Sequence, residues 1–104
     1  MPHAIRVAEN ENVFRRVNER LEELGGAGGP ISFFCECSAI DCRERIELTE
    51  CEYEHVRAAP NRFVVRPGHE RADVERIVER ATGHVVIEKT GAAGAIVAAD
   101  DPRG

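Results

Sequence analysis

Three cysteines, Cys35, Cys37 and Cys42, fall within eight residues of this 104-residue chain. A chain of this length removes only roughly 60–68% of its unfolded surface from water on folding, so its apolar core is small. The core also contains few large side chains, because the sequence has no Trp, one Tyr and four Phe. A cluster of metal-binding side chains would therefore contribute much to the stability of such a fold.

The spacing of these cysteines predicts a shared metal ion. Alternate side chains of an extended chain point to the same face, so Cys35 and Cys37 can direct both sulfurs at one ion. The four residues before Cys42 are enough to turn the chain and bring up a third sulfur. Three thiolates favour Zn²⁺, which takes four tetrahedral ligands in structural sites. Buried free thiols and a disulfide are the alternatives.

The fourth ligand has to come from the remaining cysteine or from a histidine: Cys51, His55, His69, His84 or His3. We favour His69, because it lies in a Pro-Gly-His turn after a predicted strand, and turns hold ligands rigidly. Cys51 and His55 compete with it, since their i, i+4 spacing places them on one helix face, where they could also form a thiol–imidazole pair. We interpret His84 and His3 as ordinary surface residues.

Residues 10–24 have the pattern of an amphipathic helix. Apolar side chains recur at Phe14, Val17, Leu21 and Leu24, and a glycine-rich segment follows them. We expect this stripe to pack on the chain's own sheet, although the same spacing would allow a homodimer, so the chain is a monomer or a homodimer. The alternation of Ile5 and Val7 predicts a short strand before the helix.

The remaining elements are predicted from shorter patterns. Residues 31–35 and 45–48 form a hairpin with the cysteines at its tip, and residues 62–66 and 84–89 are two more strands. A capping box at Thr49 and Glu52 begins a short helix. Apolar residues at Val74, Ile77, Val78 and Ala81 predict a second long helix over residues 70–82.

These elements predict one small α+β domain over residues 1–90, with about four strands, two longer helices and a zinc site at the hairpin tip. From Gly91 onward the sequence loses any pattern. Residues 91–104 are therefore expected to be a mobile C-terminal tail.

Charge and hydropathy limit the choice of partners and compartment. Fourteen Lys and Arg against nineteen Asp and Glu give a net charge of −5, and the cations are dispersed, which argues against nucleic acid. No stretch approaches the roughly 18–20 apolar residues that span a membrane. The N-terminal residues lack the pattern of a secretory signal, so we expect a cytoplasmic protein, whose cysteines are ligands more often than disulfides.

The run FFCECSAIDCRERIELTECEYEHVRAAPNRFVVRPGHE resembles a group of small uncharacterised actinobacterial proteins with the pattern FxCECxxxxCxxRIxLTxxEYExVRxxPxxFxVxPGH. The resemblance covers roughly residues 33–89. Cys35, Cys37, Cys42 and His69 match the pattern, whereas Cys51 falls at a variable position. The resemblance implies a Cys₃His site and no particular activity. The eight residues from 35 to 42 are also similar to the zinc-binding tail of SET-domain methyltransferases, but no SET core is present.

Our leading hypothesis is a zinc-stabilised module that binds another protein. One alternative is a redox sensor that loses zinc when a thiolate is oxidised. Another is a small zinc-dependent enzyme with an open coordination position and Glu36, Asp41 or Glu70 as a nearby base.

Overall fold

The computed structural model describes residues 3–25, 29–37, 39, 41–71, 73 and 75–103, and side chains from Glu11 onward. Within these residues the chain has an α+β fold, as predicted, with five strands in two antiparallel sheets and three helices. In chain order the elements are α1 (His3–Gly25), β1 (Ile31–Phe34), β2 (Arg45–Leu48), α2 (Glu50–Val56), β3 (Arg62–Val65), β4 (Glu75–Ala81), β5 (His84–Lys89) and α3 (Gly91–Ala99).

The predicted cysteine hairpin is the first sheet. β1 pairs with β2, with Phe33 opposite Ile46, and the segment that joins them carries the cysteines. The second sheet has the order β3-β5-β4, with β5 in the centre. The two sheets meet just after β1, where the Glu36 N–H donates to the Val64 carbonyl at 2.8 Å. One core therefore extends across both sheets.

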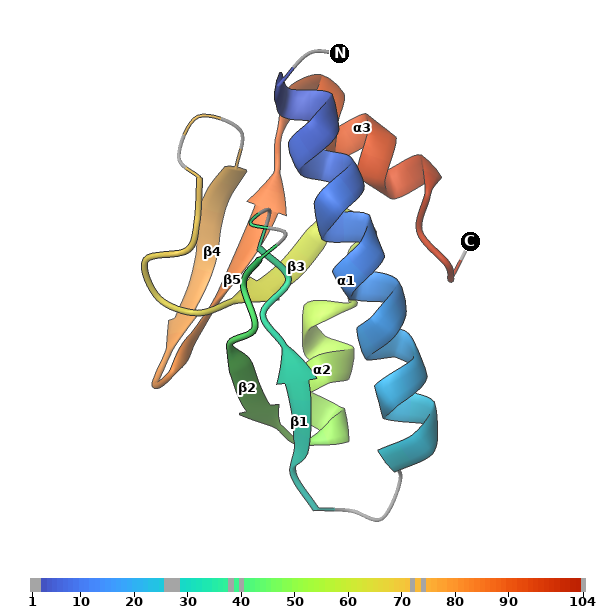
Figure 1. Cartoon of the computed structure of the whole chain (residues 1–104), viewed down its shortest axis with the longest axis vertical. Helices are drawn as coiled ribbons and strands as arrows, with labels where there is room; N and C mark the ends of the chain where they lie inside the picture. Colours follow the sequence, from blue (N-terminus) through green and yellow to red (C-terminus); the bar gives the residue numbers. More distant parts are fainter. Residues whose placement is uncertain are drawn as a thin grey trace.

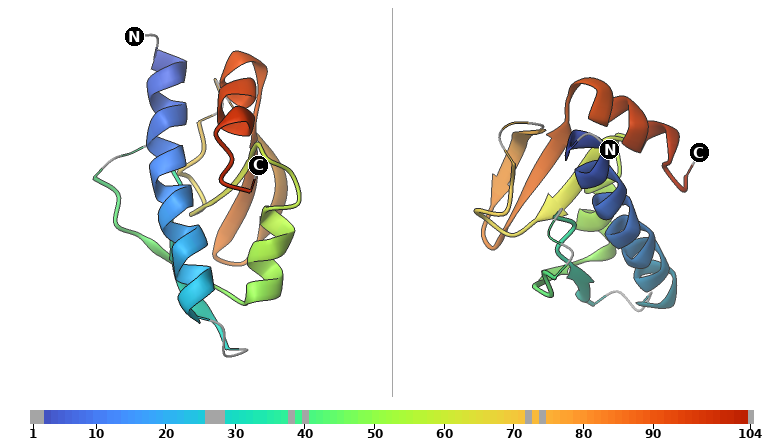
Figure 2. Two further views of the ribbon diagram at one scale, coloured as in Figure 1. Left: turned by 90° about the vertical axis from the view of Figure 1, so that its right-hand side faces the viewer. Right: turned by 45° about the horizontal axis from the view of Figure 1, so that its top comes forward.

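The helices lie around these strands. α1 runs along most of the long axis of the molecule, with α3 beside its N-terminal half (Figure 1; Figure 2 shows the same pair from two other directions). The short helix α2 packs on β2 and β3, and its predicted capping box is present: Thr49 Oγ1 accepts from the Glu52 N–H at 3.1 Å. Tyr53 of α2 is fully buried, and its ring stacks on Phe33 with 4.3 Å between the centroids.

Helix α1 is longer than predicted and has a different buried face. It begins at His3, so the predicted strand at Ile5 and Val7 is wrong, because these residues belong to a continuous helix. Phe14 is buried and Leu21 packs against the core, but Val17 is 39% exposed and Leu24 is 68% exposed. The apolar stripe is therefore only partly covered.

Apart from Phe14, the buried side chains described on α1 are polar. Arg15 is fully buried and donates to the Pro60 carbonyl at 2.5 Å and to the Val97 carbonyl at 2.7 Å. Asn18, also buried, donates to the Phe34 carbonyl and accepts from the Phe34 N–H, both at 2.8 Å. These bonds fix α1 against β1, α3 and the turn before β3, although Arg15 Nε has no hydrogen-bond partner.

The predicted second long helix over residues 70–82 is wrong, because residues 75–81 form strand β4. Ile77 lies opposite Ile87, but Glu79 lies opposite Val86, so Val78 is an extra residue in a β-bulge. A bulge shifts the alternation of a strand by one residue. The resulting apolar spacing at Ile77, Val78 and Ala81 imitates that of a helix. Val74 lies outside the described residues.

The expectation of a patternless mobile tail from Gly91 onward is also wrong. Residues 91–99 form helix α3, in which Ala93 and Val97 are buried in the core. Gly94 allows the close approach of this helix to β5, because a Cβ at this position would lie 2.7 Å from the Lys89 carbonyl oxygen. This short Ala- and Gly-rich segment has no polar face, so its sequence lacks the alternation of apolar and polar residues that predicts a helix.

Three buried charged groups meet between α1 and the second sheet. Lys89 Nζ lies 2.6 Å from Glu11 Oε1 and 2.7 Å from Glu75 Oε2. Burial and the charge of Glu75 raise the pKa of Glu11 to about 9, in spite of the attraction of Lys89. One ammonium group neutralises one carboxylate, so the second carboxyl group keeps its proton at neutral pH.

Candidate metal centre

Cys35, Cys37, Cys42 and His69 come together, as the sequence predicted. Their ligand atoms all lie within 4.8 Å of one another. His69 Nδ1 is 3.5 Å from Cys35 Sγ and 3.7 Å from Cys42 Sγ. A tetrahedral zinc ion with Zn–S of about 2.3 Å and Zn–N of about 2.0–2.1 Å separates nitrogen from sulfur by about 3.5 Å. The spacing in the cluster therefore suits a zinc ion at its centre.

The cysteines are positioned by the hairpin that carries them. The Cys35 N–H donates to the Glu44 carbonyl at 2.9 Å, which continues the β1–β2 pairing beyond the strands. Cys37 lies two residues further, where a side chain of an extended segment faces the same way. The Cys42 N–H donates to the Ala39 carbonyl at 3.0 Å and closes a turn that returns the third sulfur to the first two.

His69 comes from the other sheet. It follows β3 in a turn closed by the His69 N–H, which donates to the Arg66 carbonyl at 3.0 Å. Gly68 in this turn has φ of +90°, a conformation that favours glycine. The same turn brings the Arg66 N–H within 3.2 Å of Cys35 Sγ, so it supplies both a ligand and a hydrogen bond to another ligand.

Electrostatics in the cluster favour thiolate at one sulfur. Hydrogen bonds from the Cys35 thiol, from His69 and from the Ala39 backbone lower the pKa of Cys37 to about 5. The same thiol–thiolate contact, together with burial, raises the pKa of Cys35, and burial raises that of Cys42. Binding of a metal ion by all three sulfurs must therefore release protons.

Glu36, between the first two cysteines, is fully buried and points into the core. Its carboxylate accepts from the Val64 N–H at 3.0 Å, from the Tyr53 hydroxyl at 3.1 Å and from Asn18 Nδ2 at 2.8 Å. With both oxygens occupied, Glu36 holds the segment in place and is unsuited to be the base suggested from sequence. Its buried position between two ligands was not predicted.

The remaining candidate ligands lie elsewhere. Cys51 is exposed on α2, and His55 Nε2 is 2.7 Å from Glu79 Oε2, so neither belongs to the cluster. His84, expected on the surface, is instead buried, because its strand lies in the centre of the second sheet. The side chain of His3 lies outside the described ones.

Comparison with known proteins gives no match to a family model, to a curated protein or to a solved structure. In the described part of the chain, no helix combines the length and the apolar character needed to cross a bilayer. The chemistry of the cluster is therefore the basis for assigning a function.

Proposed function

We propose that this chain is a small zinc-binding protein in which Cys35, Cys37, Cys42 and His69 hold one structural Zn²⁺. The observation that carries the proposal is the convergence of these four ligand atoms within 4.8 Å. Four protein ligands complete a tetrahedral shell and leave no position for water or substrate. This closed shell favours a structural role over the zinc-enzyme alternative at this centre.

The zinc ion would join the two sheets. The cysteines belong to the β1–β2 hairpin, whereas His69 follows β3 of the three-stranded sheet. An isolated two-stranded hairpin is marginally stable in water. Zinc binding supplies about 10–16 kcal/mol in zinc-finger peptides, compared with about 5–15 kcal/mol for the whole stability of a typical domain. A metal at this junction would therefore decide whether the chain folds.

Metal analysis of the full chain tests this proposal. We expect one zinc per chain and a colourless protein, because thiolate and imidazole ligands in a tetrahedral arrangement suit Zn²⁺. Replacement by Co²⁺ should give the visible absorption of a tetrahedral thiolate site. A protein that is purified without metal and melts at the same temperature with and without chelator would overturn the proposal.

We propose further that the stabilised module binds a protein partner through α1. Val13, Val17 and Leu24 are the large apolar side chains exposed among the described residues. The net charge of −5, with its cations dispersed along the sequence, disfavours nucleic acid, and cysteines that bind zinc instead of forming disulfides suit a reducing compartment such as the cytoplasm. Light scattering measures the molecular mass of the full chain and of its Val17→Lys variant. A monomeric parent leaves the α1 surface free for a partner, whereas a dimeric parent that Val17→Lys converts to a monomer uses this surface to form a homodimer.

A redox-sensing role is supported by one asymmetry in the cluster. Cys35 and Cys37 are buried, whereas Cys42 is half-exposed and accessible to a small oxidant. The Cys42 thiolate would attack peroxide, forming sulfenic acid and releasing water after proton transfer, and would cease to be a good zinc ligand. Zinc release that accompanies oxidation of Cys42 at low peroxide would support this role, whereas retention of zinc would leave the purely structural one.

A further inference from the structure

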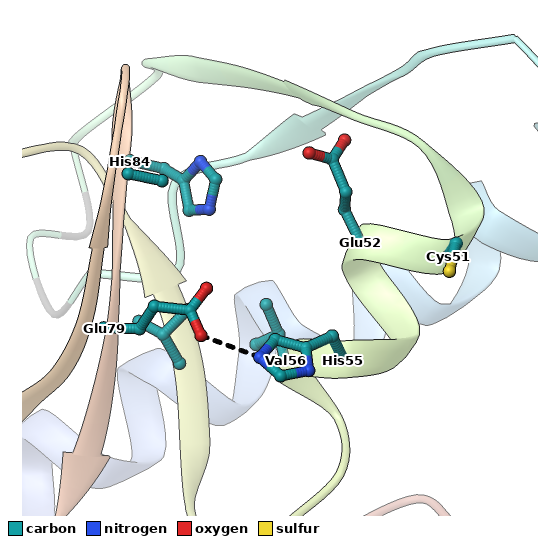
Figure 3. A pocket seen from close by; sticks show the side chains of 8 residues that line it. Cys51, Glu52, His55, Val56, Glu79 and His84 are labelled. Atoms are coloured by element: carbon teal, nitrogen blue, oxygen red, sulfur yellow. Dashed lines mark hydrogen bonds and ion pairs between the residues drawn. The ribbon is translucent and has the colours of Figure 1, made fainter.

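A second group of metal-binding side chains lies in a pocket remote from the cysteine cluster. The pocket has a volume of about 300 Å³ and lies between α2 and the β4–β5 hairpin. Val56, Ala81 and Val86 form apolar walls. The nitrogen and oxygen atoms come from His55, Glu79 and His84, and from Glu52, whose Oε1 already accepts from the Thr49 N–H (Figure 3).

His84 is the feature that points to a ligand. Its residue is only 8% exposed, and its imidazole ring is directed from β5 into the space facing α2 (Figure 3). The ring makes no hydrogen bond or ion pair with any residue that the structure describes. The ring nitrogens of His84 are not among the solvent-inaccessible polar atoms that lack a partner, so they are open to the pocket, where water or a bound ligand can reach them.

The strand register places Glu79 close to His84. Ala81 lies directly opposite His84, and Glu79 lies opposite Val86, so all four side chains project from the same face of the hairpin. Glu79 and His84 are thus diagonal neighbours, with Cβ atoms about 7 Å apart in such pairs. The small side chain of Ala81 leaves room between them for an ion held by a carboxylate and an imidazole.

His55 supplies a third ligand from α2. Its Nε2 lies 2.7 Å from Glu79 Oε2, so an ion bound by Glu79 is within reach of His55 after small rotations. Both side chains are free to rotate, because His55 is 59% exposed and Glu79 is 45% exposed. Among the described residues only the Cys₃His group already has its ligand atoms within 4.8 Å of one another. The ligand atoms of the second group therefore come together only when an ion binds, and this group binds a metal ion more weakly than the Cys₃His group.

We propose that His55, Glu79 and His84 form a second metal site, for a borderline transition metal such as Zn²⁺ or Ni²⁺. Imidazole and carboxylate ligands suit these ions. Three protein ligands leave at least one coordination position open to water or a small ligand, unlike the closed Cys₃His shell. Cys51 is not included as a ligand, because it lies at the far end of the pocket, beyond Glu52 from His84 (Figure 3).

Titration of the zinc-loaded full chain with Ni²⁺ tests the proposal. We expect one further equivalent to bind, with paramagnetic broadening of the His55 and His84 ring signals. His55→Ala, Glu79→Gln and His84→Ala should each weaken Ni²⁺ binding by about tenfold or more. His55 is exposed, so its variant remains informative even if His84→Ala does not fold. Cys51→Ser is the matched control from the same pocket and should bind Ni²⁺ unchanged.

Two results would overturn the second site: no further equivalent of Ni²⁺, or unchanged affinity in His55→Ala. Binding that is lost in His3→Ala but kept in His55→Ala would likewise assign the ion to the N-terminus. Metal binding at the Cys₃His cluster is measured separately, by the visible absorption of the Co²⁺-substituted protein. Failure of one site is therefore distinguishable from failure of the other.

Discussion

Glu36 and Val64 are joined by two hydrogen bonds: the Glu36 N–H donates to the Val64 carbonyl at 2.8 Å, and the Val64 N–H donates to Glu36 Oε1 at 3.0 Å. The side chain of Glu36 here replaces the carbonyl of a neighbouring strand. Because Glu36 lies between Cys35 and Cys37, this contact fixes the spacing of two candidate ligands against β3.

Glu36→Gln is expected to lower the free energy of unfolding of the zinc-loaded protein by about 2–3 kcal/mol. The NH₂ group that replaces one carboxylate oxygen cannot accept a hydrogen bond, so at least one donor among Val64, Tyr53 and Asn18 loses its acceptor. Urea denaturation measures the loss. Glu44→Gln is the control, since Glu44 is exposed and lies two residues from Cys42 in sequence. Equal stability of the two variants would contradict a positioning role for Glu36.

Loss of a thiolate ligand should remove both metal and fold. We expect Cys37→Ser to be isolated without zinc and to melt without a cooperative transition, because ligand loss removes metal-binding free energy from folding. Cys51→Ser should keep one zinc and the parental melting temperature, because Cys51 is exposed and remote from the cluster. Metal analysis and circular dichroism on the same samples give both answers. Loss of zinc from Cys51→Ser would show that the ligand set is wrong.

The fourth ligand is tested by substitutions at His69. His69→Ala is expected to weaken zinc binding by at least about tenfold, because three thiolates leave one position to water. His69→Cys should restore a four-ligand shell and much of the affinity, if the turn at Gly68 holds the new thiolate near the other three. Competition with a chromophoric chelator measures both affinities. An alanine variant that binds as tightly as the parent would exclude His69.

The buried group at Glu11 predicts a specific pH dependence. Its pKa is about 9 in the folded protein, compared with the ordinary 4.5, because of burial and the charge of Glu75. The folded state therefore keeps a proton that the unfolded state loses above pH 4.5. The contribution of Glu11 to the free energy of unfolding is fully present below pH 4.5. It decreases as pH rises to about 9, by up to about 1.4 kcal/mol per pH unit.

Glu11→Gln imitates the protonated acid, so it should flatten the fall in unfolding free energy between pH 5 and pH 9. Glu23→Gln is the control, because Glu23 is exposed on the same helix. Urea denaturation at a series of pH values compares the slopes. The same slope in the parent and in Glu11→Gln would show that Glu11 is ionised in the folded protein.

Gly94→Ala distinguishes helix propensity from packing in α3. Alanine is the better helix former by about 1 kcal/mol, so an unpacked helix would gain stability. In the structure the new Cβ would lie 2.7 Å from the Lys89 carbonyl oxygen, which is backbone and cannot move freely. We therefore expect a loss of about 1–3 kcal/mol, measured by thermal or urea denaturation. A stabilised variant would show that α3 does not pack closely on β5.

The cysteine cluster could be predicted from sequence because its determinants are local. Cys35, Cys37 and Cys42 lie within one hairpin, and His69 lies in a Pro-Gly turn whose conformation depends on its own residues. The chemistry of thiolate and imidazole then restricts what such a group can bind. Only the three cysteines are brought together by a short loop, whereas His69 reaches them because the second sheet packs beside the hairpin.

The errors come from contacts between distant residues. The bulge at Val78 is set by pairing with β5, and the single-sequence pattern of β4 therefore imitates a helix. The buried face of α1 contains Arg15 and Asn18, whose partners lie on β1, on α3 and before β3. Hydropathy ranks these polar side chains as exposed, because it contains no information on partners far along the chain.

The contact between Asn18 and Phe34 also affects how the molecule meets its neighbours. A strand at the edge of a sheet offers free N–H and C=O groups to which another chain can add, and such additions lead to aggregates. At Phe34 both groups are occupied by a single amide side chain from α1. A foreign strand must displace that amide before it can extend the hairpin there. Asn18→Leu leaves this edge open, so we expect it to precipitate at a lower protein concentration than the parent.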